Sequence, residues 1–84
     1  MKNKIDENIL KVLSKPDEIL KVIVIGVNSS AVNEICKIRE FEGIRKINFI
    51  NAIAGHIRVR NIISFSQSPF VQSIELDQEA SVQN

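Results

Sequence analysis

The chain has 84 residues, 44% hydrophobic and 25% charged, which suits one small folded domain and is too apolar for a wholly disordered chain. Its 11 basic and 10 acidic side chains give a formal net charge of +1, so no excess of positive charge favours nucleic acid or an anionic membrane as a partner. The single cysteine cannot form an internal disulfide and supplies no metal-ligand spacing, so we expect neither a metal nor a cofactor.

Residues 1–19 predict a helical extension that precedes the main domain. Apolar side chains recur at helical spacing between residues 3 and 14, at Ile5, Ile9, Val12 and Leu13. Acidic residues come first in this stretch and lysines last, an order that the helix dipole favours. Pro16 then ends the segment.

Residues 20–27 read LKVIVIGV, an apolar and β-branched run that predicts a strand with two apolar faces. Asn28, Ser29 and Ser30 follow, and their side-chain oxygens can cap a helix. This second helix is expected to run to about Phe41 and to end before Gly43. Its inward face is predicted to consist of Val32, Ile35, Cys36 and Ile38, which places the cysteine in the core.

Two extended stretches come next, residues 44–50 and 53–59, and a tight connection near Asn51 and Ala52 predicts that they pair as a hairpin. In the second stretch, Ile53, Gly55, Ile57 and Val59 are expected on one face and Ala54, His56 and Arg58 on the other.

The last part of the domain predicts a helix and a strand. A helix over residues 60–67 should bury Ile62 and Phe65 until Ser68 and Pro69 end it. Residues 70–76 predict a fourth strand with Val71 and Ile74 in the core, and residues 78–84 are a polar tail.

The predicted order β-α-β-β-α-β over residues 20–77 is that of an α+β, ferredoxin-like domain, in which a four-stranded antiparallel sheet carries two helices on one face. The other face of such a sheet is normally polar, but the strand near residues 22–27 does not alternate. Either a partner protein covers this face or the N-terminal helix does.

The segment from Ser68 to Gln78, SPFVQSIELDQ, resembles the end of the propeptides of subtilisin-like serine proteases and of related stand-alone inhibitors. Their pattern of proline, apolar and acidic residues is matched in register by Pro69, Val71, Ile74, Glu75 and Asp77. Phe49, Ile50, Asn51 and Ala52 resemble a second stretch of the same family. The resemblance covers Lys21 to Asn84, whereas the preceding residues have no counterpart and the second helix of the domain is less charged than usual.

The resemblance implies that the chain is not an enzyme and has no catalytic residues of its own. Its partner would be the catalytic domain of a cognate subtilisin-like protease, on which the sheet docks. Glu75 and Asp77 would cap the N-termini of two protease helices, whose free N–H groups and positive dipole ends attract carboxylates.

The C-terminal tail would occupy the substrate cleft of the protease, according to the same resemblance. It consists of Gln78, Glu79, Ala80, Ser81, Val82, Gln83 and Asn84. The cleavage-site residue is Asn84 if the chain end is the natural product, or Gln83 if the register is counted from Asp77. By docking on native helices, the domain would also act as an intramolecular chaperone for its protease.

The residues after Met1 are charged rather than apolar, so we expect neither a signal peptide nor a membrane-spanning helix here. This is consistent with a cytoplasmic or spore-associated protein, or with a secreted one whose signal has been removed.

Two alternatives to the propeptide stay open: a stand-alone subtilase inhibitor, and a ferredoxin-like regulatory module that binds a ligand and homodimerises through its sheet. An RNA-binding module is disfavoured because the chain has no Tyr or Trp to stack on bases. His56 is interpreted as a structural or surface histidine, and the basic residues Arg45, Lys46, Arg58 and Arg60 as a solvated surface.

Overall fold

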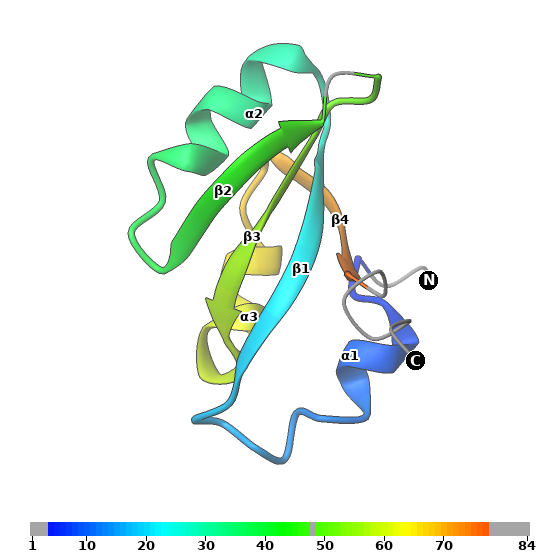
Figure 1. Ribbon diagram of the computed structural model, residues 1–84, viewed down its shortest axis with the longest axis vertical. Coiled ribbons are helices and arrows are strands. Elements are labelled where there is room, and N and C mark those ends of the chain that lie inside the picture. The colour runs from blue at the N-terminus through cyan, green and yellow to red at the C-terminus, as the bar shows by residue number, and fades with distance from the viewer. Residues whose placement is uncertain (1–3, 48, 78–84) are drawn as a thin grey trace.

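The apolar run Ile19–Gly26 forms β1, one of the two central strands of a four-stranded sheet. The computed structural model describes residues 4–47 and 49–77. The strand order is β2-β3-β1-β4, and every neighbouring pair is antiparallel (Figure 1). This order and the alternation of helices and strands confirm the predicted α+β, ferredoxin-like fold.

The remaining elements follow in the predicted sequence, preceded by a short N-terminal helix. Their bounds are α1 (Glu7–Leu10), α2 (Ser29–Cys36), β2 (Phe41–Ile47), β3 (Ala52–Arg58), α3 (Val59–Ser66) and β4 (Val71–Leu76). Asn28 caps α2 as its side chain predicts, since its Oδ1 accepts a hydrogen bond from the Ala31 amide at 2.9 Å. None of the helices in the described ranges is long and apolar enough to span a bilayer.

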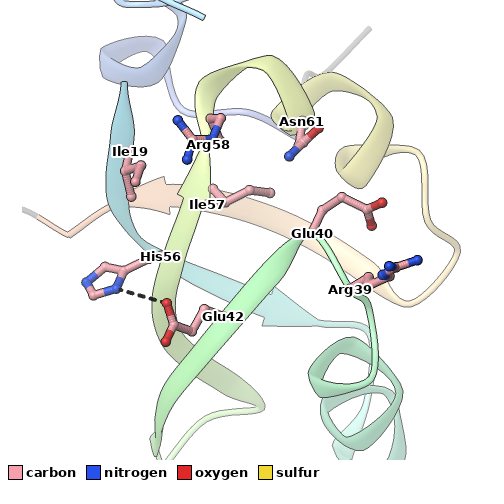
Figure 2. Close-up of a pocket in the computed structure, with 8 residues that line it drawn as sticks. All are labelled: Ile19, Arg39, Glu40, Glu42, His56, Ile57, Arg58 and Asn61. Atoms are coloured by element: carbon pink, nitrogen blue, oxygen red, sulfur yellow. Dashed lines mark ion pairs between the residues drawn. The ribbon is translucent and has the colours of Figure 1, made fainter. Parts of the chain in front are cut away.

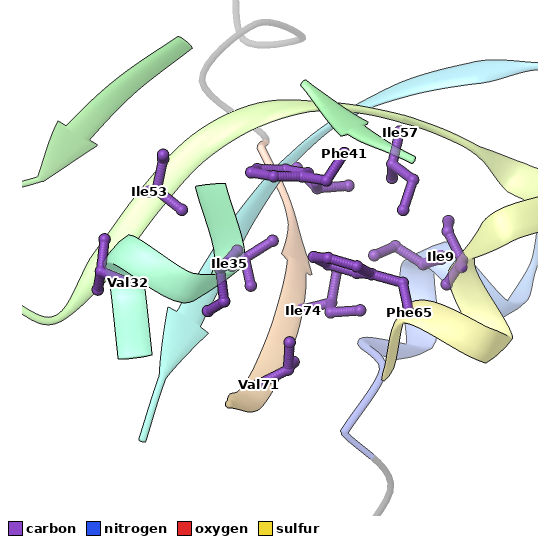
Figure 3. Close-up of a cluster of buried hydrophobic side chains, with 12 residues drawn as sticks. Ile9, Val32, Ile35, Phe41, Ile53, Ile57, Phe65, Val71 and Ile74 are labelled. Carbon is purple, nitrogen blue, oxygen red and sulfur yellow. The ribbon is translucent and has the colours of Figure 1, made fainter. Parts of the chain in front are cut away.

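The hydrophobic core lies between one face of the sheet and the helices (Figure 3). Val22 and Val24 of β1 are fully buried in it, together with Ile35 of α2 and Ile62 of α3. The predicted inward residues Phe65, Val71 and Ile74 are buried as well. Alternate residues of β1 point the other way and are only half-buried, so the sheet has one covered face and one that the described helices do not cover.

The N-terminal segment differs from the predicted extension. Its helix α1 is one turn long, and the chain before it lies beside β4, where Ile5 forms a parallel bridge with Ile74. Ile9 has no exposed surface and belongs to the same core as Ile35 and Ile62. The segment therefore completes the covered side of the sheet and does not lie across the opposite face.

The second helix is shorter than its apolar spacing suggests. Backbone N–H groups of Lys37 and Ile38 bond to carbonyls three residues back, which tightens the last turn and ends α2 at Cys36. Phe41 starts β2 instead of ending the helix, because its buried ring stacks on Phe65 with centroids 5.2 Å apart. Two predictions are therefore wrong: Gly43 lies within β2, and Cys36 is exposed rather than in the core.

The hairpin is confirmed with its strands shifted toward the N-terminus by one to three residues. Ile53, Gly55 and Ile57 share the core face of β3, while His56 is half-buried on the other face and Arg58 is exposed. Val59 was expected to continue this strand, but it is the first residue of α3.

Candidate functional site

The sheet face opposite the helices, here called the open face, is the candidate site because the resemblance assigns docking to it. It is built from rows of side chains that cross the strands. In the first row, Ile25 of β1 lies between Ala52 of β3 and Ser73 of β4. In the second, Ile23 lies between Ala54 and Glu75, and in the third, Lys21 lies opposite His56.

The edge strand β2 contributes to these rows through a β-bulge. Its register shifts between Gly43 and Arg45, so that Arg45 pairs with Ala54 and Ile47 pairs with Ala52. The extra residue is Ile44, which is 59% exposed. Because a bulge breaks regular pairing and bends the strand, it also makes this free edge a poor template for adding another strand.

The centre of the open face is apolar. Ile23, Ile25 and Ile47 are half-buried, and the small side chains of Ala52 and Ala54 lie between them. Because alanine side chains are short, the surface is lower at Ala52 and Ala54 than at the isoleucines around them. A hollow of about 190 Å³ lies beside this centre and is lined in part by Lys21, Ile44, Arg45, Ala54, His56 and Asp77. A partner that covered this surface would bury the exposed part of these isoleucines, and each Å² of apolar surface removed from water would stabilise the complex by about 25 cal/mol.

Glu75 and Asp77, the two acids that the sequence singles out, lie on this face at its β4 side. Glu75 is exposed and lies opposite Ile23. Asp77 follows β4, and its amide donates a hydrogen bond to the Lys21 carbonyl at 2.9 Å, which continues the pairing with β1. Residues two apart in an extended strand point to the same side, so the two carboxylates leave the sheet in one direction.

The open face carries charges of both signs, and they are not separated between its two edges. Glu75 lies on the edge strand β4, whereas Asp77 lines the hollow that also contains Lys21 and Arg45. A third acid, Glu42, lies on β2 opposite His56. The exposed carboxylate of Glu75 at the β4 edge favours a partner that presents positive charge there.

A second hollow, of about 310 Å³, lies at the end of the sheet where β3 joins α3 (Figure 2). His56 and Glu42 face each other across β3 and β2, with 3.9 Å between Nδ1 and Oε1. Arg39, Glu40 and Arg58 add charges of both signs around the hollow. Such a mixture gives no net charge to select a ligand, and it contains no serine, threonine or cysteine that could act as a nucleophile.

Several predicted site residues lie outside the described part of the chain. These are the seven tail residues Gln78, Glu79, Ala80, Ser81, Val82, Gln83 and Asn84, which include both candidate cleavage-site residues. Their proposed place in a protease cleft stays a prediction. Within residues 4–47 and 49–77, no group of three or more histidine, cysteine or acidic side chains could hold a metal ion.

Sequence reasoning missed the contact between the N-terminal segment and β4. Asp6 caps α1 by accepting a hydrogen bond from the Asn8 amide, and its second carboxylate oxygen accepts one from the Leu76 amide. An aspartate before an apolar helical pattern is a capping signal that could have marked the start of α1. The long-range bond to Leu76 has no local signal.

Comparison with known proteins identifies no relative: no protein-family model, no curated protein and no solved structure matches the chain. Any functional conclusion therefore rests on the fold and on the open face.

Proposed function

We propose that the chain is the inhibitory propeptide domain of a subtilisin-like serine protease and acts as its intramolecular chaperone. In this proposal the open face docks on two neighbouring surface helices of the protease, and the tail after Asp77 enters the substrate cleft. The observation that carries the proposal is the placement of Glu75 and Asp77 together on the uncovered face, next to its apolar centre.

The dimensions of the open face suit two helices lying side by side. Four strands spaced about 4.8 Å apart extend about 14 Å from the first strand axis to the last, and two packed helices with axes about 10 Å apart fit across this width. The low apolar centre around Ala52 and Ala54 would receive side chains from both helices. This contact would supply the hydrophobic part of the binding energy.

The acids at the β4 edge would orient the complex. A helix N-terminus carries unpaired N–H groups and a partial positive charge, and a carboxylate placed there is worth on the order of 1 kcal/mol, more where water is excluded. Glu75 and Asp77 leave the sheet in the same direction, so each could cap one of two adjacent helices.

Inhibition would follow from tethering. The tail begins directly after the docked strand, so docking raises the local concentration of the tail at the cleft. There it would pair with exposed strand edges of the protease as an added strand. Docking on native helices would likewise stabilise the folding transition state of the protease, which is the physical basis of the proposed chaperone role.

Inhibition of subtilisin itself tests this proposal. The full chain is expected to inhibit peptide hydrolysis in the nanomolar range, while a chain that ends at Asp77 should bind without blocking the cleft. Size-exclusion chromatography of the free chain should show a monomer. Failure of the full chain to inhibit at micromolar concentration, or a stable homodimer whose sheet is already covered, would contradict the proposal and favour the regulatory module.

A further inference from the structure

The N-terminal strap, defined as residues 4–10, is hydrogen-bonded to the outer edge of β4 (Figure 1). The Ile74 amide donates to the Lys4 carbonyl at 2.7 Å, and the Asp6 amide donates to the Ile74 carbonyl at 2.9 Å. At the next outward-facing amide of β4, that of Leu76, the Asp6 carboxylate accepts the bond at 3.2 Å. A side-chain oxygen thus takes the place of a backbone carbonyl where the strap turns into α1.

The strap is anchored on both sides of this contact. Ile9 inserts fully into the core one turn after Asp6. Before it, the Lys4 ammonium donates to the Ser68 carbonyl at 3.2 Å. The second oxygen of Asp6 accepts from the Asn8 amide and starts α1. Asp6 therefore joins a fixed helix start to the end of β4.

Glu75 lies between the two β4 amides that the strap binds. On its inner side it pairs with Ile23 of β1, and on its outer side the amides of Ile74 and Leu76 are held by the strap. An edge strand held on one side only frays at its end, where exposed hydrogen bonds open at low cost. Loss of the Asp6 carboxylate would free the outer side at the end of β4, where Glu75 and Asp77 are located.

We propose that Asp6 is a positioning residue for partner binding, which holds the end of β4 so that Glu75 is presented in a fixed geometry on the open face. The proposal rests on the proposed function. It predicts that Asp6 controls how long the complex lasts although its own carboxylate is engaged by Leu76 and Asn8 rather than by the protease. Preordering Glu75 would lower the entropic cost of docking.

The test compares Asp6→Ala in the full chain with two controls. Glu7→Ala removes a neighbouring exposed acid and leaves the strap intact. Ile62→Val shortens a core side chain of α3 that makes no hydrogen bond to the strap, and it controls for a general loss of stability. The dissociation rate is measured from subtilisin whose catalytic serine is replaced by alanine, and hydrogen exchange of the Leu76 amide is measured in the free chain.

Asp6→Ala removes the acceptors of both the Asn8 and the Leu76 amides. It is expected to raise the dissociation rate about five- to tenfold, because the end of β4 is no longer held, and to accelerate Leu76 exchange selectively. Both controls should stay within about twofold of the wild type for dissociation. Should Asp6→Ala not fold, Asp6→Asn removes the negative charge and one of the two acceptor oxygens, so that only one of the Asn8 and Leu76 amides keeps its partner, and Leu76 exchange shows which one.

Unchanged Leu76 exchange, or a dissociation rate no higher than that of Ile62→Val, would overturn the proposal. A wild-type chain that does not bind subtilisin would instead contradict the proposed function, and the exchange measurement would still decide whether Asp6 holds the end of β4.

Discussion

Replacing Gly55 by alanine should destabilise the domain strongly, because the ring of Phe41 occupies the space where a Cβ would lie. A Cβ on Gly55 would come within 2.6 Å of Phe41 Cζ and would also meet the Glu42 carbonyl oxygen. The ring cannot move away freely, since it is buried and stacks on Phe65 at 5.2 Å.

Overpacking of this kind costs about 1–3 kcal/mol, and we expect the upper end because one neighbour is backbone. Alanine also lowers the conformational entropy of the unfolded chain relative to glycine, which offsets about 0.4–1 kcal/mol of this destabilisation. The net loss of about 2 kcal/mol corresponds to a fall in Tm of roughly 8–16 °C for a domain of this size.

Urea and thermal unfolding followed by circular dichroism measure this loss, with Gly26→Ala as the matched control. A Cβ on Gly26 would lie 3.3 Å from the Ala31 Cβ and 3.4 Å from the Asn28 carbonyl oxygen, contacts that small shifts relieve. Gly26→Ala should therefore change the free energy of unfolding by less than about 1 kcal/mol. Equal stability of the two variants would show that Phe41 does not pack on Gly55 as described.

Three further predictions concern the open face, the N-terminal segment and the helix α2. Glu75→Ala should raise the inhibition constant against subtilisin about five- to tenfold without changing the stability of the domain. Glu18→Ala, which removes an exposed acid from outside β4, should leave the inhibition constant unchanged. Equal effects of the two variants would show that Glu75 does not cap a protease helix. Ile9→Ala should cost about 2–5 kcal/mol of unfolding free energy, because Ile9 is fully buried, and a loss below 1 kcal/mol would show that the segment is a separate extension. Cys36 should react with a thiol reagent in the native protein, because it is exposed; reaction only after denaturation would place it in the core.

The order of the domain's strands and helices could be predicted because local patterns and tertiary packing agree there. The apolar run of β1 is buried against the helices on one side and forms the centre of the open face on the other. Ile62 and Phe65 fall three residues apart on α3 and both reach the core. The acids were placed on the fourth strand by their register, and the structure puts Glu75 on the uncovered face.

The parts that were not predicted depend on contacts between distant residues. Phe41 continues an apolar helical spacing, but its stacking on Phe65 and its pairing with Ile57 draw it into β2. Cys36 also fits the apolar stripe, yet α2 ends at this residue and leaves its side chain exposed. Asp6 and Leu76 are 70 positions apart in the sequence, and no local pattern predicts their hydrogen bond.

Methyl cross-saturation between the isoleucine-labelled chain and subtilisin with an inactivated catalytic serine tests the central claim most directly. The account predicts that saturation of the protease reaches the methyl groups of Ile23 and Ile25, which lie on the open face, and leaves those of Ile35 and Ile62 in the core unaffected. If a stable complex forms but saturation does not reach the methyl groups of Ile23 and Ile25, docking through the open face is contradicted.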